Sequence, residues 1–446
     1  MQQYLTIWDL VLTPIFLLIL SFIARRRRDR LYPVGHPLRR YYLPGLYVKF
    51  GGVIFIALVY QYYYGEGDTF FFFDHARTIN SALGDSFTSW VRLLLRTSPD
   101  EHPELYKYTS QLTFYRDKSS YTVASITAVL GVFSGTTYMP TALLFAYLAY
   151  TGIWAMYKTF ANIYPKLHKE LAWAFLFIPS TVVWGSAIFK DTICMFGLGW
   201  MVYTTFRIFI NRDFSLGNVF MLIFSFYLIG IIKVYILLAF LPSLSLWLLL
   251  TYSHKVKPAA LRFLISAGFI GIVVAGFLFF SQQFSKELNR YSLERVAYTS
   301  QVTRGWITYA SGEEGSAYDL GEFEPTVGGM MSKFPAAVAV TLYRPFLWES
   351  RKVIVLLSAL EALVFIFLTL YVLFRNGPGN IFTGFFKDPN IIFCLIFSLI
   401  FAFAVGISTY NFGSLSRYKI PCLPFYAAFL ILLTNQKNEF TRKQAA

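Results

Sequence analysis

Two carboxylates, Glu66 and Asp68, alternate with two glycines in the run 65–68, directly after a long apolar segment. A positioned carboxylate can act as a general base that takes the proton of a hydroxyl group. An ionisable side chain at the end of a membrane segment is costly and is a candidate functional residue by default. We therefore interpret Asp68 as the candidate catalytic residue, with Glu66 as its neighbour.

Basic residues stand at the ends of other apolar segments. Lys190 precedes Asp191, Lys233 stands alone, and Arg417 and Lys419 share a later turn. Arginine binds phosphate through a fork of donors, and lysine binds it as a point charge. If these turns meet in space, the four basic side chains predict a phosphate or diphosphate site. The simpler alternatives are a capping pair at Lys190 and Asp191 and interface anchors at the others.

Three further residues are candidates for the same site. Arg344 and Glu349 lie near the end of the second long segment between predicted spans. They either reach the predicted phosphate site or belong to a belt of residues at the membrane interface. His75, near Asp74 and Asp68, has the residue types of a metal site, so a divalent metal ion remains an open alternative. The sequence has no Walker loop, HExxH or GxSxG pattern, which argues against nucleotide binding by a known motif.

Composition determines the kind of protein that carries these residues. Of the 446 residues, 56% are hydrophobic and only 14% are charged, whereas soluble domains have about a quarter charged residues. A helix needs about 20 apolar residues to cross a bilayer. We therefore predict an all-α, polytopic membrane protein whose three cysteines are buried thiols. The net charge of +15 is explained by basic inner loops rather than by nucleic-acid binding.

The apolar runs predict about 11 transmembrane helices in a single domain, 1–446. Two long outer loops, 65–140 and 282–351, separate groups of these helices, and the run 120–135 is expected to lie at the membrane surface. The predicted spans are 4–24, 43–64, 141–161, 171–189, 192–210, 217–232, 234–252, 262–281, 352–374, 390–410 and 418–434.

Loop charges predict the orientation. With the N-terminus outside, the inner segments carry 20 lysines and arginines against five acids, and the outer segments 65–119 and 282–352 carry 14 against 16. This is the asymmetry of the positive-inside rule. The run 25–30, with five arginines, is the strongest inner anchor. Because long ordered loops tend to carry function, we expect the active face to be the outer one.

This layout resembles the GT-C superfamily of polytopic glycosyltransferases, which use polyprenyl- or dolichyl-phosphate sugars. The resemblance rests on a carboxylate after an early span, a long first outer loop, basic residues at later outer turns and the run 417–424 (RYKIPCLP). It implies that Asp68 is the base or metal partner. It also implies that Lys190, Lys233, Arg417 and Lys419 hold the lipid phosphate.

The resemblance implies a multi-pass protein of the bacterial inner membrane, with a periplasmic N-terminus and a cytoplasmic C-terminus. Its expected partners are a polyprenyl-phosphate lipid and a glycan or protein acceptor. A polymerase or ligase of lipid-linked oligosaccharides is the nearest alternative, because it shares the basic outer turns. A transporter or a structural subunit of an envelope complex is the alternative from another class.

Overall fold

The structure, a computed structural model, describes residues 3–253, 317–324, 326–350, 352–377, 379 and 388–444. The predicted span 262–281 and the part 282–316 of the second long loop lie outside these residues. The chain divides into two compact units, Met1–Val234 and Tyr235–Ala446.

Helices form both units, and within the described ranges the only β pairing is one isolated bridge between Ala317 and Asn411. Seven described helices are long and apolar enough to cross a membrane, or eight if one bent pair is a span. They are α1 (Ile7–Leu31), α2 (Arg39–Val59, continued to Tyr64), α7 (Tyr138–Ile163), α10 (Lys190–Phe209), α11 (Leu216–Ser253), α17 (Val353–Asn376) and α19 (Pro389–Thr409), and the bent pair is α20 (Phe412–Tyr418) with α21 (Leu423–Gln444). A multi-pass membrane protein is therefore supported, whereas a count of eleven spans is not confirmed.

Two differences account for most of the change in number. The segment predicted as the span 171–189 forms two short helices, α8 (His168–Leu176) and α9 (Pro179–Trp184). The break has a local cause, because the residue before a proline avoids helical torsions, and Ile178 is extended (φ −65°, ψ 121°). The segments predicted as 217–232 and 234–252 are two helical stretches that meet at a kink at Lys233 (φ −147°, ψ 76°), as the sequence predicts, but they are named together as α11 and counted as one candidate span.

In the first unit, α7 packs against α1, α2, α8 and α10. Its contact with α10 is unusually close, since a Cβ on Gly152 would lie 2.2 Å from the carbonyl oxygen of Phe196. A Cβ on Gly199 would lie 2.0 Å from the carbonyl oxygen of Gly152. Small residues of this kind allow two membrane helices to bring their backbones together.

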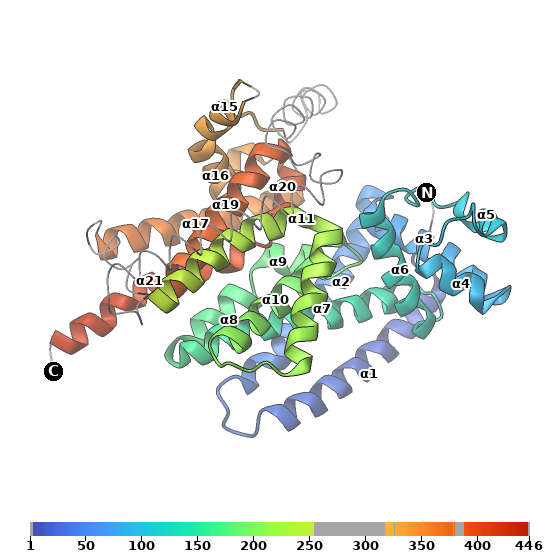
Figure 1. The fold of residues 1–446 in the computed structure, drawn as a ribbon, viewed down its shortest axis with the longest axis horizontal. Helices are drawn as coiled ribbons and strands as arrows, with labels where there is room; N and C mark the ends of the chain where they lie inside the picture. Colours follow the sequence, from blue (N-terminus) through green and yellow to red (C-terminus); the bar gives the residue numbers. More distant parts are fainter. Residues whose placement is uncertain are drawn as a thin grey trace. The chain divides into compact units, whose positions relative to one another are not determined.

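The segment between α2 and α7 folds into a small helical layer. Its helices are α3 (Asp68–Ser81), α4 (Phe87–Leu94), α5 (Tyr106–Thr109) and α6 (Lys118–Phe133), of which α3, α4 and α6 lie side by side (Figure 1). A buried cluster that includes Ile79, Leu93 and Tyr121 forms its core. This layer confirms a helix over most of the predicted surface segment 120–135.

The four consecutive phenylalanines of α3 have the composition of a helix that lies in the membrane interface. Phe70, Phe72 and Phe73 are instead buried, and only Phe71 is exposed. Phe70 stacks on Tyr4 with ring centroids 4.0 Å apart and meets Tyr138 at 4.8 Å. The run therefore belongs mainly to the core that joins α3 to the start of α7.

The second unit contains α15 (Val327–Ser332), α16 (Phe334–Tyr343), α17, α19, α20 and α21, besides the end of α11. Helix α16 packs closely on α19, where the Thr341 hydroxyl donates to the carbonyl oxygen of Ala402 (2.8 Å). Short helical turns of other types complete the fold, at Tyr60–Tyr64 (π), Ala82–Gly84, Pro103–Leu105, Pro165–Leu167 and Leu347–Glu349.

Candidate functional site

The acidic run forms an ordered turn between α2 and α3. The π-helical turn Tyr60–Tyr64 ends at Gly65 with φ 80°, and Gly67 has φ 145°. A Cβ on Gly67 would lie 2.3 Å from the ring of Tyr60. The glycines therefore provide torsions and space that other residues cannot. Glu66 and Asp68 are both exposed, and Asp68 is the first residue of α3, where a carboxylate complements the helix dipole.

Asp74 and His75 follow on α3 but have different partners. The Tyr4 hydroxyl donates to the Asp74 carboxylate (2.8 Å), and burial raises the pKa of this half-buried acid. His75 is buried against Phe114, with Nε2 3.1 Å from the hydroxyl of Thr113, and burial lowers its pKa. Within the described residues no three His, Cys, Asp or Glu side chains form a metal-binding group. His75 therefore has no such ligand set around it for a divalent metal ion.

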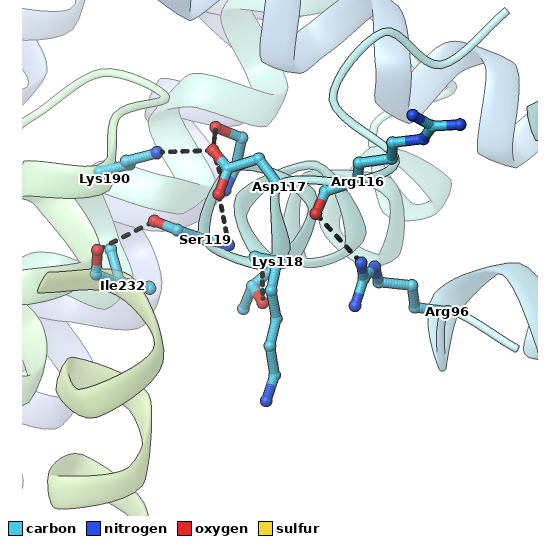
Figure 2. A network of polar contacts seen from close by, with 9 residues as sticks. Arg96, Arg116, Asp117, Lys118, Ser119, Lys190 and Ile232 are labelled. Atoms are coloured by element: carbon cyan, nitrogen blue, oxygen red, sulfur yellow. Dashed lines mark hydrogen bonds and ion pairs between the residues drawn. The ribbon is translucent and has the colours of Figure 1, made fainter. Parts of the chain in front are cut away.

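Lys190, at the start of α10, forms an ion pair with Asp117 of the neighbouring helix α6. Its Nζ lies 3.3 Å from the Asp117 carboxylate (Figure 2). Asp117 is also the N-cap of α6, because its carboxylate accepts from the backbone N–H groups of Ser119 and Ser120. Although burial opposes ionisation, the hydrogen bond from the Ser120 hydroxyl and the charge of Lys190 hold the pKa of Asp117 below its ordinary value.

The next residue of α10, Asp191, pairs with Lys233 of α11. Asp191 is fully buried, Lys233 is 7% exposed, and the two side chains form an ion pair. Close by, the Ser119 hydroxyl donates to the carbonyl oxygen of Ile232 (2.9 Å), so α6 contacts α11 beside the break in that helix (Figure 2). Lys190 and Lys233 thus lie at adjoining helix ends with Asp117 and Asp191, and we refer to these four residues as the first ionic cluster.

Tyr60 connects the acidic turn to this cluster. Its ring fills the space beside Gly67, the residue before Asp68. The same ring lies 5.8 Å from that of Phe189, the residue before Lys190. Gly67, which precedes Asp68, and the ring of Phe189, which precedes Lys190, therefore both lie against the Tyr60 ring.

The remaining candidates lie in the second unit. Arg344 holds Glu349 with two donors of its guanidinium group, one of them Nε at 3.1 Å, and it lies over the ring of Phe412. Lys419 is fully buried, with Nζ 3.5 Å from the carbonyl oxygen of Arg344. The buried carboxylate of Glu361 on α17 interacts electrostatically with Lys419. We refer to Arg344, Glu349, Glu361 and Lys419 as the second ionic cluster. Arg417, two residues before Lys419, is half-buried and lies over the ring of Tyr418.

Sequence reasoning overlooked two residues. Asp117 could have been found as the capping residue before the helical run 118–133. Lys49 could have been found as the lone charge inside the predicted span 43–64. It is 1% exposed, and its Nζ donates to the carbonyl oxygens of Thr181 (2.7 Å) and Gly185 (3.0 Å).

The ten candidate residues therefore form two groups. Glu66, Asp68, His75, Lys190, Asp191 and Lys233 lie in the first unit, and Arg344, Glu349, Arg417 and Lys419 lie in the second. That the residues of both groups belong to one site remains a prediction. Comparison with family models, with curated proteins and with solved structures finds no match to the chain.

Proposed function

We propose that this protein is a membrane glycosyltransferase that transfers a sugar from a polyprenyl-phosphate donor to an envelope acceptor on the periplasmic side. The observation that carries the proposal is that the Tyr60 ring lies against both Gly67 of the acidic turn and Phe189, the residue before α10. The next residues along the chain from Gly67 and Phe189 are an exposed acid, Asp68, and a partly exposed lysine, Lys190. A transferase of this class needs both a base and a cation that binds phosphate.

In the proposed reaction, Asp68 takes the proton of the acceptor hydroxyl as its oxygen forms a bond to the anomeric carbon of the sugar. The bond from that carbon to the phosphate oxygen breaks, and the lipid phosphate leaves with the electron pair. Lys190 would stabilise the departing charge. Lys190 suits this role better than Lys233, because its partner Asp117 is itself half exposed and can be displaced by an anion.

Lys233, Arg417 and Lys419 keep supporting roles in this proposal. Lys233 would fix Asp191 and hence the first turn of α10. Arg417 and Lys419 would bind the lipid phosphate, as the resemblance to the GT-C superfamily implies. The eleven-span topology in the inner membrane, with a periplasmic N-terminus and a cytoplasmic C-terminus, belongs to the same proposal.

The test is sugar transfer by the purified protein in lipid nanodiscs, supplied with polyprenyl-phosphate donors of several sugars. We expect Asp68→Asn to lower the rate by about 10²–10⁴-fold, the usual contribution of a general base. Glu101→Gln is the matched control, because Glu101 is an exposed acid of the same outer segment. An unchanged rate in Asp68→Asn would refute the assigned base.

The same variant tests the nearest alternative. A polymerase or ligase of lipid-linked oligosaccharides has no need of an acid at this position. Asp68→Asn would then keep full activity on a diphosphate-linked oligosaccharide, while the protein would be inactive on monophosphate donors. A transporter or structural subunit would release no polyprenyl phosphate from any of these substrates.

A further inference from the structure

Lys49 lies in the middle of α2, in a helix apolar enough to cross a membrane. Its ammonium group donates to two carbonyl oxygens, those of Thr181 and Gly185, in the last turn of α9 and just after it. The Thr181 carbonyl oxygen also accepts from the Gly185 backbone N–H (3.2 Å). The end of a helix leaves other carbonyl groups without intrahelical partners, and a cation there complements the helix dipole. Because a membrane offers no water to satisfy such groups, Lys49 stabilises a helix end that would otherwise be costly.

The contact between α2 and α9 leaves no room for larger residues. Gly52 is three residues after Lys49, on the same side of α2, and a Cβ there would lie 2.7 Å from the carbonyl oxygen of Val182. A Cβ on Gly185 would lie 2.9 Å from the Lys49 Nζ. The end of α9 is therefore held against α2 by direct backbone contact as well as by the ammonium group.

The segment after Gly185 connects this contact to the first ionic cluster. Residues 186–189 are buried and non-helical, and they lead directly to Lys190 and Asp191 at the start of α10. The Thr192 hydroxyl donates to the carbonyl oxygen of Ala187 (2.6 Å), so this linker is also held from its far end. Non-helical backbone at membrane depth is tolerated only where protein surrounds it or where it lines a cavity.

We propose that Lys49 is a positioning residue, which fixes the end of α9 and thereby sets the place of Lys190 and Asp191. It acts through the linker 186–189 and does not itself touch the substrate. The ordering of the linker does not depend on the proposed transferase activity. Its consequence, a site able to bind a lipid phosphate through Lys190, rests on the proposed function.

The first measurement is hydrogen–deuterium exchange of peptides covering 185–192, on the full-length protein in nanodiscs. We expect at least tenfold faster exchange in Lys49→Met, which removes the ammonium group from a side chain of similar length. Lys49→Arg retains donors for both carbonyl groups and should restore slow exchange. Lys118→Met is the matched control, because the Lys118 side chain is exposed and points away from the first ionic cluster (Figure 2). Unchanged exchange in Lys49→Met would overturn the proposal.

Gly52→Ala provides a second test if Lys49→Met does not fold. Its methyl group would press on the Val182 carbonyl while the ammonium group stays in place, so exchange in 185–192 should rise. Gly51→Ala is its control, since a Cβ on Gly51 meets nothing within 4 Å. Equal exchange in the two alanine variants would count against a linker set by the α2–α9 contact.

The second measurement is binding of farnesyl phosphate, which separates the two proposals. We expect about tenfold weaker binding by Lys49→Met and recovery in Lys49→Arg, with Lys118→Met unchanged. If exchange responds but all variants bind farnesyl phosphate equally, Lys49 orders the linker without positioning a phosphate site, and that part is overturned. If the wild-type protein does not bind this probe while exchange still responds, the proposed function fails and the ordering role of Lys49 stands.

Discussion

The buried pair of Asp191 and Lys233 and the more exposed pair of Asp117 and Lys190 differ in what they contribute to stability. The side chains of Lys233 and Asp191 are 8% and 0% exposed, against 23% and 48% for Lys190 and Asp117. Removing one partner of a buried pair leaves an uncompensated charge and costs about 3–5 kcal/mol. An exposed pair contributes about 0–1 kcal/mol, because water already solvates both groups. We therefore expect these adjacent residues of α10 to have different roles. Asp191 stabilises the fold, and Lys190 is available to bind a ligand.

This difference predicts the outcome of single substitutions in the two pairs. Lys233→Met should lower the free energy of unfolding by about 3–5 kcal/mol, whereas Lys190→Met should lower it by at most about 1 kcal/mol. Combining Asp191→Leu with Lys233→Met should recover much of the loss, since no lone charge remains. Chemical unfolding in detergent measures the free energy of unfolding of the wild-type protein, the two single variants and the double variant. Equal losses in the two single variants would contradict the assignment.

At the scale of elements, glycines determine where helices meet. Helices α7 and α10 touch at Gly152 and Gly199, where neither position has space for a Cβ. The start of α10 is set from its other side by α9, whose end rests on Gly52 of α2. The helix that carries Lys190 is thus located by backbone contacts, which change less than contacts between long side chains.

Gly152→Val should disrupt the α7–α10 contact. The added methyl groups would overlap the carbonyl oxygen of Phe196, and overpacking of this kind costs about 1–3 kcal/mol, or more where backbone must move. Gly51→Val is the matched control on α2, because a Cβ at that position lies in open space. The melting temperature of each protein in detergent measures the effect. Similar melting temperatures for the two variants would show that the contact is not tight.

The sequence predicts helices better than their interruptions. Long apolar runs are a strong signal, so α1, α2, α7, α10, α17 and α19 lie where the sequence predicts spans. Pro179 is a local signal for the break, because the residue before a proline avoids helical torsions, whereas the predicted span 171–189 rests on apolar residues alone. For Lys233 the sequence predicts a turn between two helices, and the structure has a kink with non-helical torsions at this residue, where two helical stretches of α11 meet.

The site was predictable as a set of residue types but not as a set of pairs. Lys190 and Lys233 are visible as costly charges at the ends of apolar runs. Their pairing is not visible: the sequence suggests Asp191 as the neighbour of Lys190, whereas Lys190 pairs with Asp117, 73 residues away, and Asp191 pairs with Lys233, 42 residues away. Such pairs depend on how α6, α10 and α11 pack, which no local pattern encodes. Lys49 shows the same limit, because its partners are backbone carbonyls of a distant helix.

At the scale of the whole molecule, the distribution of charge predicts which segments face the cytoplasm. Basic residues exceed acids in the predicted inner segments, and acids slightly exceed basic residues in the two long outer segments. The three cysteines, Cys194, Cys394 and Cys422, are buried thiols. They should therefore react slowly with a reagent in water, so that a cysteine introduced at an exposed position can be followed on its own.

Cysteine labelling in bacterial spheroplasts tests the orientation. A membrane-impermeant maleimide should label Glu101→Cys in intact spheroplasts, because the predicted topology places 65–119 outside. Lys169→Cys, in the predicted inner segment 158–170, should react only after the membrane is opened. Both positions are exposed, so a failure to react reports the side of the membrane. The reverse pattern would place the acidic turn in the cytoplasm and exclude a periplasmic active face.

The fit of Tyr60 against Gly67 also affects how a mutational survey of this chain should be read. Every replacement at position 67 places a Cβ in overlap with the edge of the Tyr60 ring, at a backbone torsion that favours glycine, so all of them should score as poorly as the loss of a chemical group. A survey by activity alone would then rank this glycine with Asp68, although it has no side chain to react. Removing the ring, as in Tyr60→Ala, should relieve the overlap but not the strain of a side chain at φ 145°, so Gly67 variants should stay impaired in that background, and the backbone torsion itself is what this turn requires.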